Sequence, residues 1–489
     1  MKPNFFIAKE VLQIGEKLDQ QGLEAYIVGG CVRDLFLSRE PDDWDIATNA
    51  LPETVQKIFP DSIYENRFGT VGVKTQDAGL VEVTTYRQEE EYSDFRHPDR
   101  VSYAKEIQQD LKRRDFTINA MAINCGGVDQ ESDLEKLLKN LKDPFDGRID
   151  LNNKIIRCVG EPTTRLKEDA LRLMRAVRFS VSLNFEIENQ TQEAIKQLAY
   201  LLGEIAQERI RDELVKILKS DRPTQGIETL RKLGLLKNIL PELELGVGVE
   251  QNLHHIYNVY DHALLSLKNC PSEKLSVRLA ALLHDIAKPQ TKSGKGPNST
   301  FYNHDVIGAR TVRKMLGRLK FSGKIIQKVE LLIRNHMFYY EVGTVSEASV
   351  RRLIKKVGLE NIKDLIDLRI ADRLGSGCPK AKPYKLRHLE YLIEKVSKDP
   401  ISVAKLAING NDLKNELKME PGPKMGAILE VLLAKVIEEP ELNKKEQLLV
   451  LAKELAEKNL SQLRKQAKTK IQEKKIEEDR IIKKRHWVK

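Results

Sequence analysis

Two aspartates one residue apart, Asp43 and Asp45 in "DDWDIATNA", are the side chains best suited to chemistry. If this stretch is a strand, both carboxylates share one face, while Trp44 and Ile46 turn into the core. Two carboxylates on one face repel each other unless a divalent cation lies between them, and a pair of Mg²⁺ ions is the usual arrangement for phosphoryl transfer. Glu82 in "VEVTT" is the candidate third carboxylate, and the alternative is an ordinary solvent-facing strand residue.

A glycine pair precedes these carboxylates. Gly29 and Gly30 follow the apolar run "AYIV" and open an amphipathic segment. Glycines between a strand and a helix let phosphate oxygens approach the backbone, and the first turn of the helix offers free N–H groups to an anion. Arg33 lies one turn into that helix, within reach of the same phosphates. A glycine pair alone is also typical of a simple tight turn.

A row of charged residues recurs at every third position in "EDALRLMRAVRF", namely Asp169, Arg172, Arg175 and Arg178. On an α-helix this spacing makes a stripe that drifts by about 60° per step. Three arginines on one stripe repel one another unless an anion faces them. The alternative is an ordinary helix surface on which each arginine pairs with a nearby Glu or Asp.

The elements that position these residues change character along the chain. "AYIVGG" and "LVEVTTY" are typical of strands, residues 8–20 have helical spacing, and residues 113–123 fit either a helix or a strand. Beyond about residue 160 the periodic segments are almost all helical, up to a charged tail after residue 441, which is either a plain solvated helix or one that contacts RNA. The pattern predicts an α+β head followed by helical regions.

Composition narrows the classes of function. Lys and Arg total 82 against 72 Asp and Glu, and the formal net charge of +10 favours a polyanionic partner. The cysteines form no C-x-x-C pair, so neither a zinc site nor a disulfide framework is indicated. No apolar run approaches the ~18 residues of a membrane span, and the N-terminus carries charges where a signal peptide is apolar. We expect a cytoplasmic protein without membrane contact, and nothing indicates a protein partner.

Five motifs occur in order along residues 20 to 240: "VGGCVRDLFL…DDWDIATNA", "FGTVGV", "EVTTYR", "DLKRRDFTINAMA" and "EDALRLMRAVRF". Together they resemble the class II tRNA nucleotidyltransferases, which are the CCA-adding enzymes and their bacterial poly(A) polymerase relatives. The resemblance implies a polymerase-β-like nucleotidyltransferase head followed by all-α neck, body and tail regions. It also implies that Asp43 and Asp45 bind Mg²⁺ and, with Glu82, form the catalytic site.

The same resemblance implies a set of nucleotide contacts. The residues that match or extend the family motifs are Gly29, Gly30, Arg33, Arg114, Asp115, Asp169, Arg172, Arg175 and Arg178. Within this set, Asp169 and Arg172 match the pair that reads the incoming base. Cytosine and adenine both present an amino donor beside a ring-nitrogen acceptor, whereas uracil and guanine present the reverse pattern. One Asp–Arg pair can therefore accept CTP and ATP and reject UTP and GTP without a template.

A second group of motifs follows: "YDHALLSL", "LLHDIAKP", "FYNHDVIGA", "IRNHMFYY" and "RIADRLG". They resemble the HD phosphohydrolase superfamily, whose signature is His…His-Asp…Asp. The resemblance implies a metal site formed by His262, His284, Asp285 and Asp372, with His304 and His336 as further candidate ligands. Such ligands suit a divalent metal that activates water, with Mg²⁺, Mn²⁺ and Ni²⁺ all open. The implied substrates are 2′,3′-cyclic or terminal phosphates, and the alternative is an inactive HD fold kept for RNA binding or dimerisation.

These interpretations predict four regions: a head at 1–150, a helical neck and body at 151–249, an HD domain at 250–375 and a helical, RNA-binding tail at 376–489. The predicted function is the addition of C, C and A to the 3′ end of tRNA from CTP and ATP. The segment "RQEEEYSDFRHPDRVSY" favours A addition because it contains the flexible loop that CC-adding relatives lack in part. Addition of A alone or of poly(A), a phosphohydrolase whose head only binds nucleotide, and an RNA-binding scaffold are the alternatives.

Overall fold

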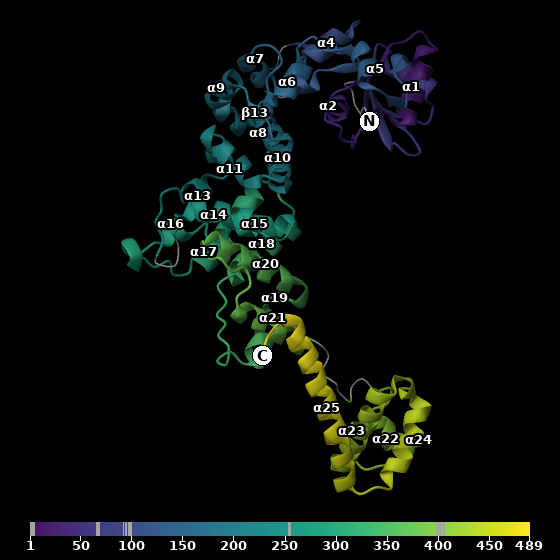
Figure 1. Cartoon of the computed structure of the whole chain (residues 1–489), viewed down its shortest axis with the longest axis vertical. Helices are drawn as coiled ribbons and strands as arrows, with labels where there is room; N and C mark the ends of the chain where they lie inside the picture. Colours follow the sequence, from purple (N-terminus) through teal and green to yellow (C-terminus); the bar gives the residue numbers. More distant parts are fainter. Residues whose placement is uncertain are drawn as a thin grey trace. The chain divides into compact units, whose positions relative to one another are not determined.

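The chain folds into two compact units. The computed structural model describes all residues except 1–4, 65–68, 91, 93–94, 96–99, 253–255, 398–402 and 404–405. The first unit comprises Met1–Arg334 and Ala371–Gly377, and the second comprises Asn335–Ile370 and Cys378–Lys489, as can be followed by residue number in Figure 1. Among the described residues, no helix has the length and apolar content needed to cross a membrane.

The first unit begins with an α+β head, which confirms the predicted fold class. Its strands are β1 (Phe5–Phe6), β2 (Ala25–Val28), β3 (Asp45–Thr48), β4 (Ile63–Tyr64), β5 (Thr70–Lys74), β6 (Leu80–Thr85), β7 (Arg87–Glu90), β8 (Arg100–Tyr103), β9 (Ala122–Asn124), β10 (Glu131–Ser132) and β11 (Leu141–Lys142). Its helices are α1 (Lys9–Asp19), α2 (Gly30–Phe36), α3 (Pro52–Ile58), α4 (Ile107–Lys112), α5 (Leu134–Lys139) and α6 (Gly147–Asn153). The main sheet has seven strands in the order β11-β9-β2-β3-β6-β5-β4. Its β3–β6 pair is parallel, and the other neighbouring pairs are antiparallel.

Alternating side chains give the centre of this sheet two apolar faces. On one face Ile27 of β2 is in register with Ile46 of β3 and Ile123 of β9, and all three are fully buried. On the other face one apolar cluster joins β2, β3 and β9 to α4, and it includes Tyr26, Val28, Ala47, Ala122, Ile107 and Leu111. Because α4 covers this face, the residues that follow its end are held next to the central strands.

The two aspartates that are predicted to bind metal, Asp43 and Asp45, lie at the start of β3. The strand begins at Asp45, so Asp43 lies in the bend before it and not within the strand as predicted. The predicted alternation is nevertheless found in the burial, because Trp44 and Ile46 are buried while Asp43 is exposed. The ambiguous segment 113–123 becomes a short 3-10 helix at Thr117–Asn119 that leads into β9.

The rest of the first unit is helical apart from a short parallel pair, β12 (Ile155–Ile156) with β13 (Glu186–Ile187). Its helices are α7 (Pro162–Glu168), α8 (Arg172–Leu183), α9 (Asn189–Leu198), α10 (Gln207–Lys219), α11 (Pro223–Lys232), α12 (Leu236–Ile239), α13 (Pro241–Glu244), α14 (Val259–Lys268), α15 (Leu275–Leu283), α16 (Lys288–Thr291), α17 (His304–Arg318) and α18 (Gly323–Asn335). α8 packs against both α10 and α11. This packing brings α10 next to the predicted base-reading segment.

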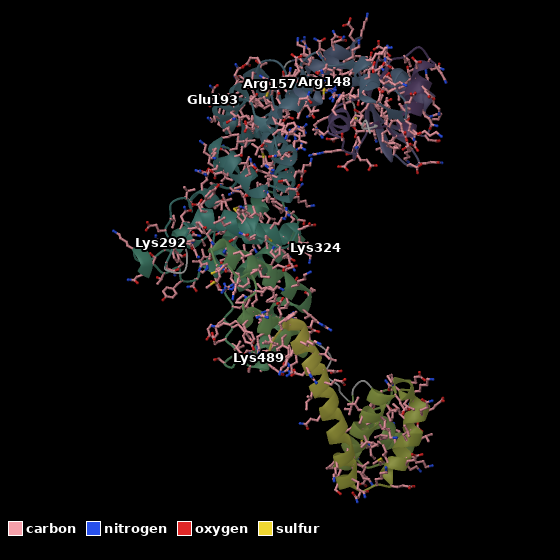
Figure 2. All side chains as sticks on the ribbon, viewed as in Figure 1. Arg148, Arg157, Glu193, Lys292, Lys324 and Lys489 are labelled. Atoms are coloured by element: carbon pink, nitrogen blue, oxygen red, sulfur yellow. The ribbon has the colours of Figure 1, made fainter. Side chains whose placement is uncertain are left out.

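The second unit is built from helices with a core of their own. They are α19 (Glu347–Val357), α20 (Leu359–Gly375, whose last residues belong to the first unit), α21 (Tyr384–Ser397), α22 (Gly410–Leu417), α23 (Pro423–Glu438), α24 (Lys445–Ala456) and α25 (Leu460–His486). Ile428, Val431 and Leu432 of α23 pack with Leu448 and Leu463 in one buried cluster. The charged tail is therefore helical, as predicted. Charged side chains such as Lys292, Lys324 and Lys489 project from the two units (Figure 2).

Candidate functional site

The glycine pair forms a tight turn between β2 and α2. Gly29 has φ 83° and ψ −134°, a combination that a residue with a Cβ adopts only under strain. A Cβ on Gly29 would also lie 2.7 Å from Nη1 of Arg114 and 3.5 Å from Oδ2 of Asp45. The turn therefore serves close approach as well as chain reversal, because it lets a guanidinium and a carboxylate meet the backbone at one point.

The three predicted carboxylates lie in or just before two adjacent strands, β3 and β6. Asp45 of β3 is in parallel register with Glu82 of β6, so the two side chains leave the same face of the sheet. Burial is the main cause of the raised pKa of Asp45, against which Arg114 acts, while the negative charge of Asp43 raises it further. Carboxylate oxygens on one face of two adjacent strands are the ligand type that a hard divalent cation such as Mg²⁺ prefers.

Arg114 and Asp115 follow α4, and each pairs with a side chain of opposite charge. Arg114 donates to Asp110 at 3.3 Å, and its Nε is buried with no hydrogen-bond partner among the described residues. A buried guanidinium donor without a partner suits an anionic ligand. Asp115 accepts from Nε of Arg175 at 2.7 Å. Burial alone would raise the pKa of Asp115, but Arg175 and Arg172 together outweigh it and lower the pKa to about 2.

The predicted stripe of one Asp and three Arg is not carried by a single helix. Asp169 has an extended conformation between α7 and α8, so only the three arginines lie on α8. Periodicity alone missed this break because both flanking segments are helical. Each arginine has a carboxylate partner: Arg172 pairs with Glu168 at 2.6 Å, Arg175 with Asp115 and Arg178 with Glu213 at 2.7 Å. Arg172 is buried, at 9% exposed, whereas the side chains of Arg178 and Arg175 are 16% and 33% exposed, so the row of arginines runs from the interior toward the surface.

Phe179 of α8 is an unpredicted platform for these cations. The guanidinium carbons of Arg178, Arg33 and Arg175 lie 4.0, 5.3 and 5.4 Å from the centre of its ring. The negative face of an aromatic ring attracts cations. Arg33 is also held by a hydrogen bond of 2.9 Å to Oδ1 of Asn119. One buried ring thus helps to gather arginines from two helices that the sequence separates widely.

These groups surround one pocket of about 350 Å³. All the residues predicted for the nucleotidyltransferase site line it except Asp43, Glu82 and Arg178. The pocket also includes residues that sequence reasoning missed: Arg113, Asn119, Leu171, Phe179 and Arg209. Arg209 belongs to α10, and its helical pattern gave no signal for a site role. Only the packing of α10 on α8 brings it to the pocket.

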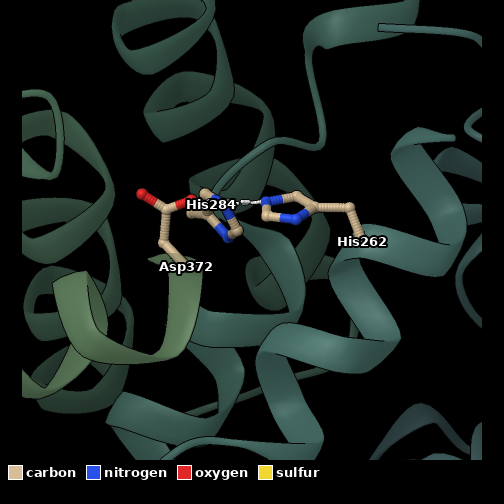
Figure 3. Close-up of side chains that lie close together, drawn as sticks. All are labelled: His262, His284 and Asp372. Atoms are coloured by element: carbon tan, nitrogen blue, oxygen red, sulfur yellow. Dashed lines mark hydrogen bonds and ion pairs between the residues drawn. The ribbon is translucent and has the colours of Figure 1, made fainter. Parts of the chain in front are cut away.

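The predicted HD residues of the first unit form a second, buried cluster, of which Figure 3 shows His262, His284 and Asp372. One ligand atom each from His262, His284 and Asp372 lies within 4.8 Å of the others. The two Nε2 atoms are 3.0 Å apart, and Oδ1 of Asp372 is 3.4 Å from Nε2 of His262. Nitrogen and oxygen donors that converge in this way fit a divalent metal of the transition series.

Asp285 and His304 extend this cluster. Oδ2 of Asp285 lies 3.3 Å from Nε2 of both His262 and His284, and its Oδ1 is 3.4 Å from Nε2 of His304. Burial would lower the pKa of His262, but its hydrogen bonds to Asp285 and Asp372 outweigh it and raise the pKa to about 9. His336 is buried directly after α18 and belongs to the second unit, so its role as a ligand stays a prediction.

Comparison with known proteins assigns most of the chain to one family. Residues 25–157 match the Poly A polymerase head domain, 184–245 a probable RNA and SrmB binding site of polymerase A, and 304–452 a putative second domain of tRNA nucleotidyltransferases. The CCA-adding enzyme of Enterococcus faecalis is 32% identical over 469 residues, which cover 92% of this chain and 96% of that protein. The chain belongs to the family of CCA-adding enzymes. The CCA-adding enzyme of Lactiplantibacillus plantarum is 33% identical over 456 residues, which cover 93% of this chain and 97% of that protein.

Solved structures of the CCA-adding family share this fold. The CCA-adding enzyme of Bacillus stearothermophilus in complex with CTP is 29% identical, with a TM-score of 0.58 over 91% of this chain and 97% of that chain. The CCA-adding enzyme of Thermotoga maritima complexed with tRNA shares the fold at 20% identity, with a TM-score of 0.51 over 92% of this chain and 96% of that one. Membership makes the chain a tRNA nucleotidyltransferase and implies that it depends on a divalent metal.

Proposed function

We propose that this protein adds C, C and A to the 3′ end of tRNA, using CTP and ATP without a nucleic-acid template. The observation that carries the proposal is the single pocket in which a glycine turn, Arg33 and Arg114 meet Asp45 at one end, with Asp169 and Arg172 also in its lining. The first group has the chemistry to hold a triphosphate and the second has the chemistry to read a base. The cytoplasm is the expected setting.

In the triphosphate half, the residues supply charge and close approach. Arg33 and Arg114 bind phosphate oxygens through charge-assisted hydrogen bonds, and Gly29 lets the triphosphate reach the backbone. Asp43, Asp45 and Glu82 would hold Mg²⁺, which when bound supplies an activated primer hydroxyl and neutralises charge on the departing pyrophosphate. The primer hydroxyl attacks the α-phosphorus in line with the leaving group.

In the base half, the donors and acceptors select the nucleotide. The carboxylate of Asp169 accepts from the exocyclic amino group of cytosine or adenine, and the guanidinium of Arg172 donates to the adjacent ring nitrogen. Uracil and guanine would place a carbonyl oxygen against the carboxylate. Asp115, held by Arg175, is in the motif that senses the ribose in the family.

The test uses three transcripts of one tRNA that end before CCA, after C and after CC. Each is offered CTP, ATP or both with Mg²⁺, and the product lengths are read on a gel. Complete CCA on the shortest transcript supports the proposal. Extension of only the CC-ended transcript by one A, or a long ladder of A, would replace it by A addition alone or by poly(A) synthesis.

A second activity is favoured by the buried His-Asp cluster. We propose that His262, His284, Asp285 and Asp372 hold a divalent metal that serves hydrolysis of 2′,3′-cyclic or terminal phosphates. The proposal rests on the convergence of their ligand atoms within a few ångströms and on the donor types. Metal analysis after exposure to Mg²⁺, Mn²⁺ or Ni²⁺, followed by hydrolysis assays with a 2′,3′-cyclic nucleotide, tests it. A protein that binds none of these metals would favour an inactive HD fold.

A further inference from the structure

Asp169 has a standing partner that is not part of the base-reading pair. Arg209, the third residue of α10, donates from Nη1 to Oδ1 of Asp169 at 3.1 Å and from Nη2 to Oδ2 at 2.8 Å. A bidentate Arg–carboxylate contact fixes the plane of the carboxylate as well as its position. The two side chains are 25% and 19% exposed, so the pair is shielded from most of the solvent.

A third hydrogen bond reduces what is left for a ligand. Oδ1 of Asp169 also accepts from the backbone N–H of Leu171 at 3.1 Å. An ionised carboxylate has about four lone-pair positions. Among the described residues, Oδ1 has two contacts and Oδ2 has one, so the acceptor position that stays open is the second one on Oδ2. The structure thus defines both the oxygen and the direction from which an amino group can bind.

Arg172, the other half of the reading pair, is held in a similar way. Its Nη1 donates to the carbonyl oxygen of Arg165 at 2.8 Å and to Oε2 of Glu168 at 2.6 Å, and its Nη2 donates to the carbonyl oxygen of Arg113 at 3.1 Å. Both reading groups are therefore fixed by neighbours before any nucleotide arrives. Reading groups that are fixed in advance lose little entropy on binding and tolerate few misplaced partners.

We propose that Arg209 is a specificity-determining positioning residue of the nucleotide pocket. It holds the carboxylate of Asp169 so that its one open acceptor position faces the amino group of cytosine or adenine. The inference rests on the proposed function, because it assumes that Asp169 reads the base. Arg209 does not touch the base in this account. It acts through Asp169.

The consequence for selection follows from which nucleotides use the oriented oxygen. CTP and ATP gain a hydrogen bond from it, whereas UTP and GTP gain none. Without Arg209 the carboxylate can rotate, and the amino bases lose most of that hydrogen bond. Incorporation of CTP then falls while incorporation of UTP changes little, so the discrimination between them narrows.

The variants are Arg209→Met, Arg209→Lys and the control Arg211→Met in the full-length protein. Arg211 lies on the same helix with a side chain that is 26% exposed, closely matched to Arg209, but it pairs with Asp212. The assay measures kcat and KM for single addition of CTP or UTP to a tRNA transcript that ends before CCA. Arg209→Met is expected to lower the CTP-to-UTP ratio of kcat/KM by roughly tenfold to a hundredfold, the effect of one misplaced charge-assisted hydrogen bond.

The other two variants sharpen the outcome. Arg209→Lys should fall between the wild type and Arg209→Met, because an ammonium group cannot reproduce the two-point contact. Arg211→Met should keep the wild-type ratio. If Arg209→Met proves too unstable to assay, a lowered ratio in Arg209→Lys supports the inference and an unchanged ratio overturns it.

A purely structural role for Arg209 predicts a different result. Rates with CTP and UTP would then fall by the same factor, together with a lower melting temperature, and that outcome overturns the inference while leaving the proposed function intact. A wild-type protein that incorporates neither C nor A would instead overturn the proposed function, and the inference with it.

Discussion

The nucleotide pocket and the His-Asp cluster belong to the same compact unit but balance their buried charge differently. In the pocket, ion pairs join different elements: Arg175 of α8 pairs with Asp115 after α4, and Arg209 of α10 pairs with Asp169. In the cluster, imidazoles and carboxylates converge on one another, with two Nε2 atoms 3.0 Å apart. The pocket therefore keeps its geometry through fixed Arg–carboxylate pairs, whereas the cluster has the geometry of ligands around one ion. The first should be preformed and the second should depend on its metal.

The sharpest way to separate the two regions is to remove the carboxylates of one of them. Asp45→Asn keeps the shape of the side chain but removes a charge that would hold Mg²⁺. Nucleotide addition should fall by about a thousandfold or more, while hydrolysis of a 2′,3′-cyclic nucleotide is unchanged. Asp42→Asn changes an exposed neighbour and should leave both activities as they are. Full nucleotide addition by Asp45→Asn would show that the metal ligands were wrongly assigned.

The reverse experiment removes a ligand from the cluster. His284→Ala should lower the bound divalent metal by about one equivalent relative to the wild type, measured by elemental analysis after exposure to Mn²⁺ or Ni²⁺. Nucleotide addition should remain, because His284 is not among the residues that line the pocket. Parallel loss of nucleotide addition in a folded variant would mean that the two regions are coupled and that the comparison fails.

A smaller effect is expected from crowding the glycine turn. Gly29→Ala would strain the backbone and place a methyl group 2.7 Å from Nη1 of Arg114. We expect kcat/KM for CTP to fall by about a hundredfold, since a displacement near 1 Å has that effect in a positioned site. Gly79→Ala is the matched control: Gly79 also has positive φ, at 70°, but its added Cβ meets nothing within 4 Å. Equal losses of activity in both variants would assign the effect to backbone strain alone.

The smallest predicted effect concerns pH and Asp115. Its pKa in the folded protein is about 2, below the ordinary 3.8, so the carboxylate stabilises the fold above pH 3.8 and this stability is lost as the pH falls through 2. Arg175→Met should raise that pKa and lower the free energy of unfolding at neutral pH by about 2 kcal/mol. The midpoint of acid unfolding, followed by circular dichroism, should move to higher pH.

A control distinguishes this buried pair from surface charge. Arg231 pairs with Glu228 on one helix, with side chains 34% and 27% exposed, so Arg231→Met should cost about 1 kcal/mol or less. In the His-Asp cluster the stability changes with pH in the opposite direction. The pKa of His262 is raised from its ordinary 6.5 to about 9, so the charged imidazole stabilises the metal-free fold below pH 6.5, and this stability is lost as the pH rises through 9. If the midpoint of acid unfolding is the same in Arg175→Met and in the wild type, Arg175 is not what lowers the pKa of Asp115.

The sequence predicted what depends on local pattern and ordered motifs. The α+β head, β2, β6 and the helices beyond residue 160 followed from periodicity, and most pocket residues followed from the family motifs. The break at Asp169 was missed because helical spacing continues across it. Asp43 was placed inside the strand because alternation holds on both sides of the point where β3 begins. Seven of the 17 residues of the predicted loop at 87–103 lie outside the described residues, so its part in A addition stays a prediction.

The partners of the site residues could not be predicted, for a physical reason. Arg209 reaches the pocket, and Glu213 reaches Arg178, only because α10 packs on α8, and side-chain pairing across packed helices leaves no mark on local periodicity. Glu168 precedes Asp169 in the chain, yet its contact with Arg172 depends on the turn between α7 and α8. The sequence therefore indicated which groups are candidates for the chemistry, whereas the structure shows which side chains hold them in place.

The carbonyl oxygen of Arg113 has a consequence for how this site tolerates mutation. It accepts from Arg165 at 3.3 Å and from Arg172 at 3.1 Å, and the neighbouring carbonyl of Lys112 accepts from Arg165 at 2.7 Å. Every amino acid supplies a main-chain oxygen, so the side chains at 112 and 113 can change without removing these acceptors. Part of the geometry around Arg172, the proposed base-reading arginine, is thus encoded in the path of the backbone, where genetic drift at single positions cannot easily erase it.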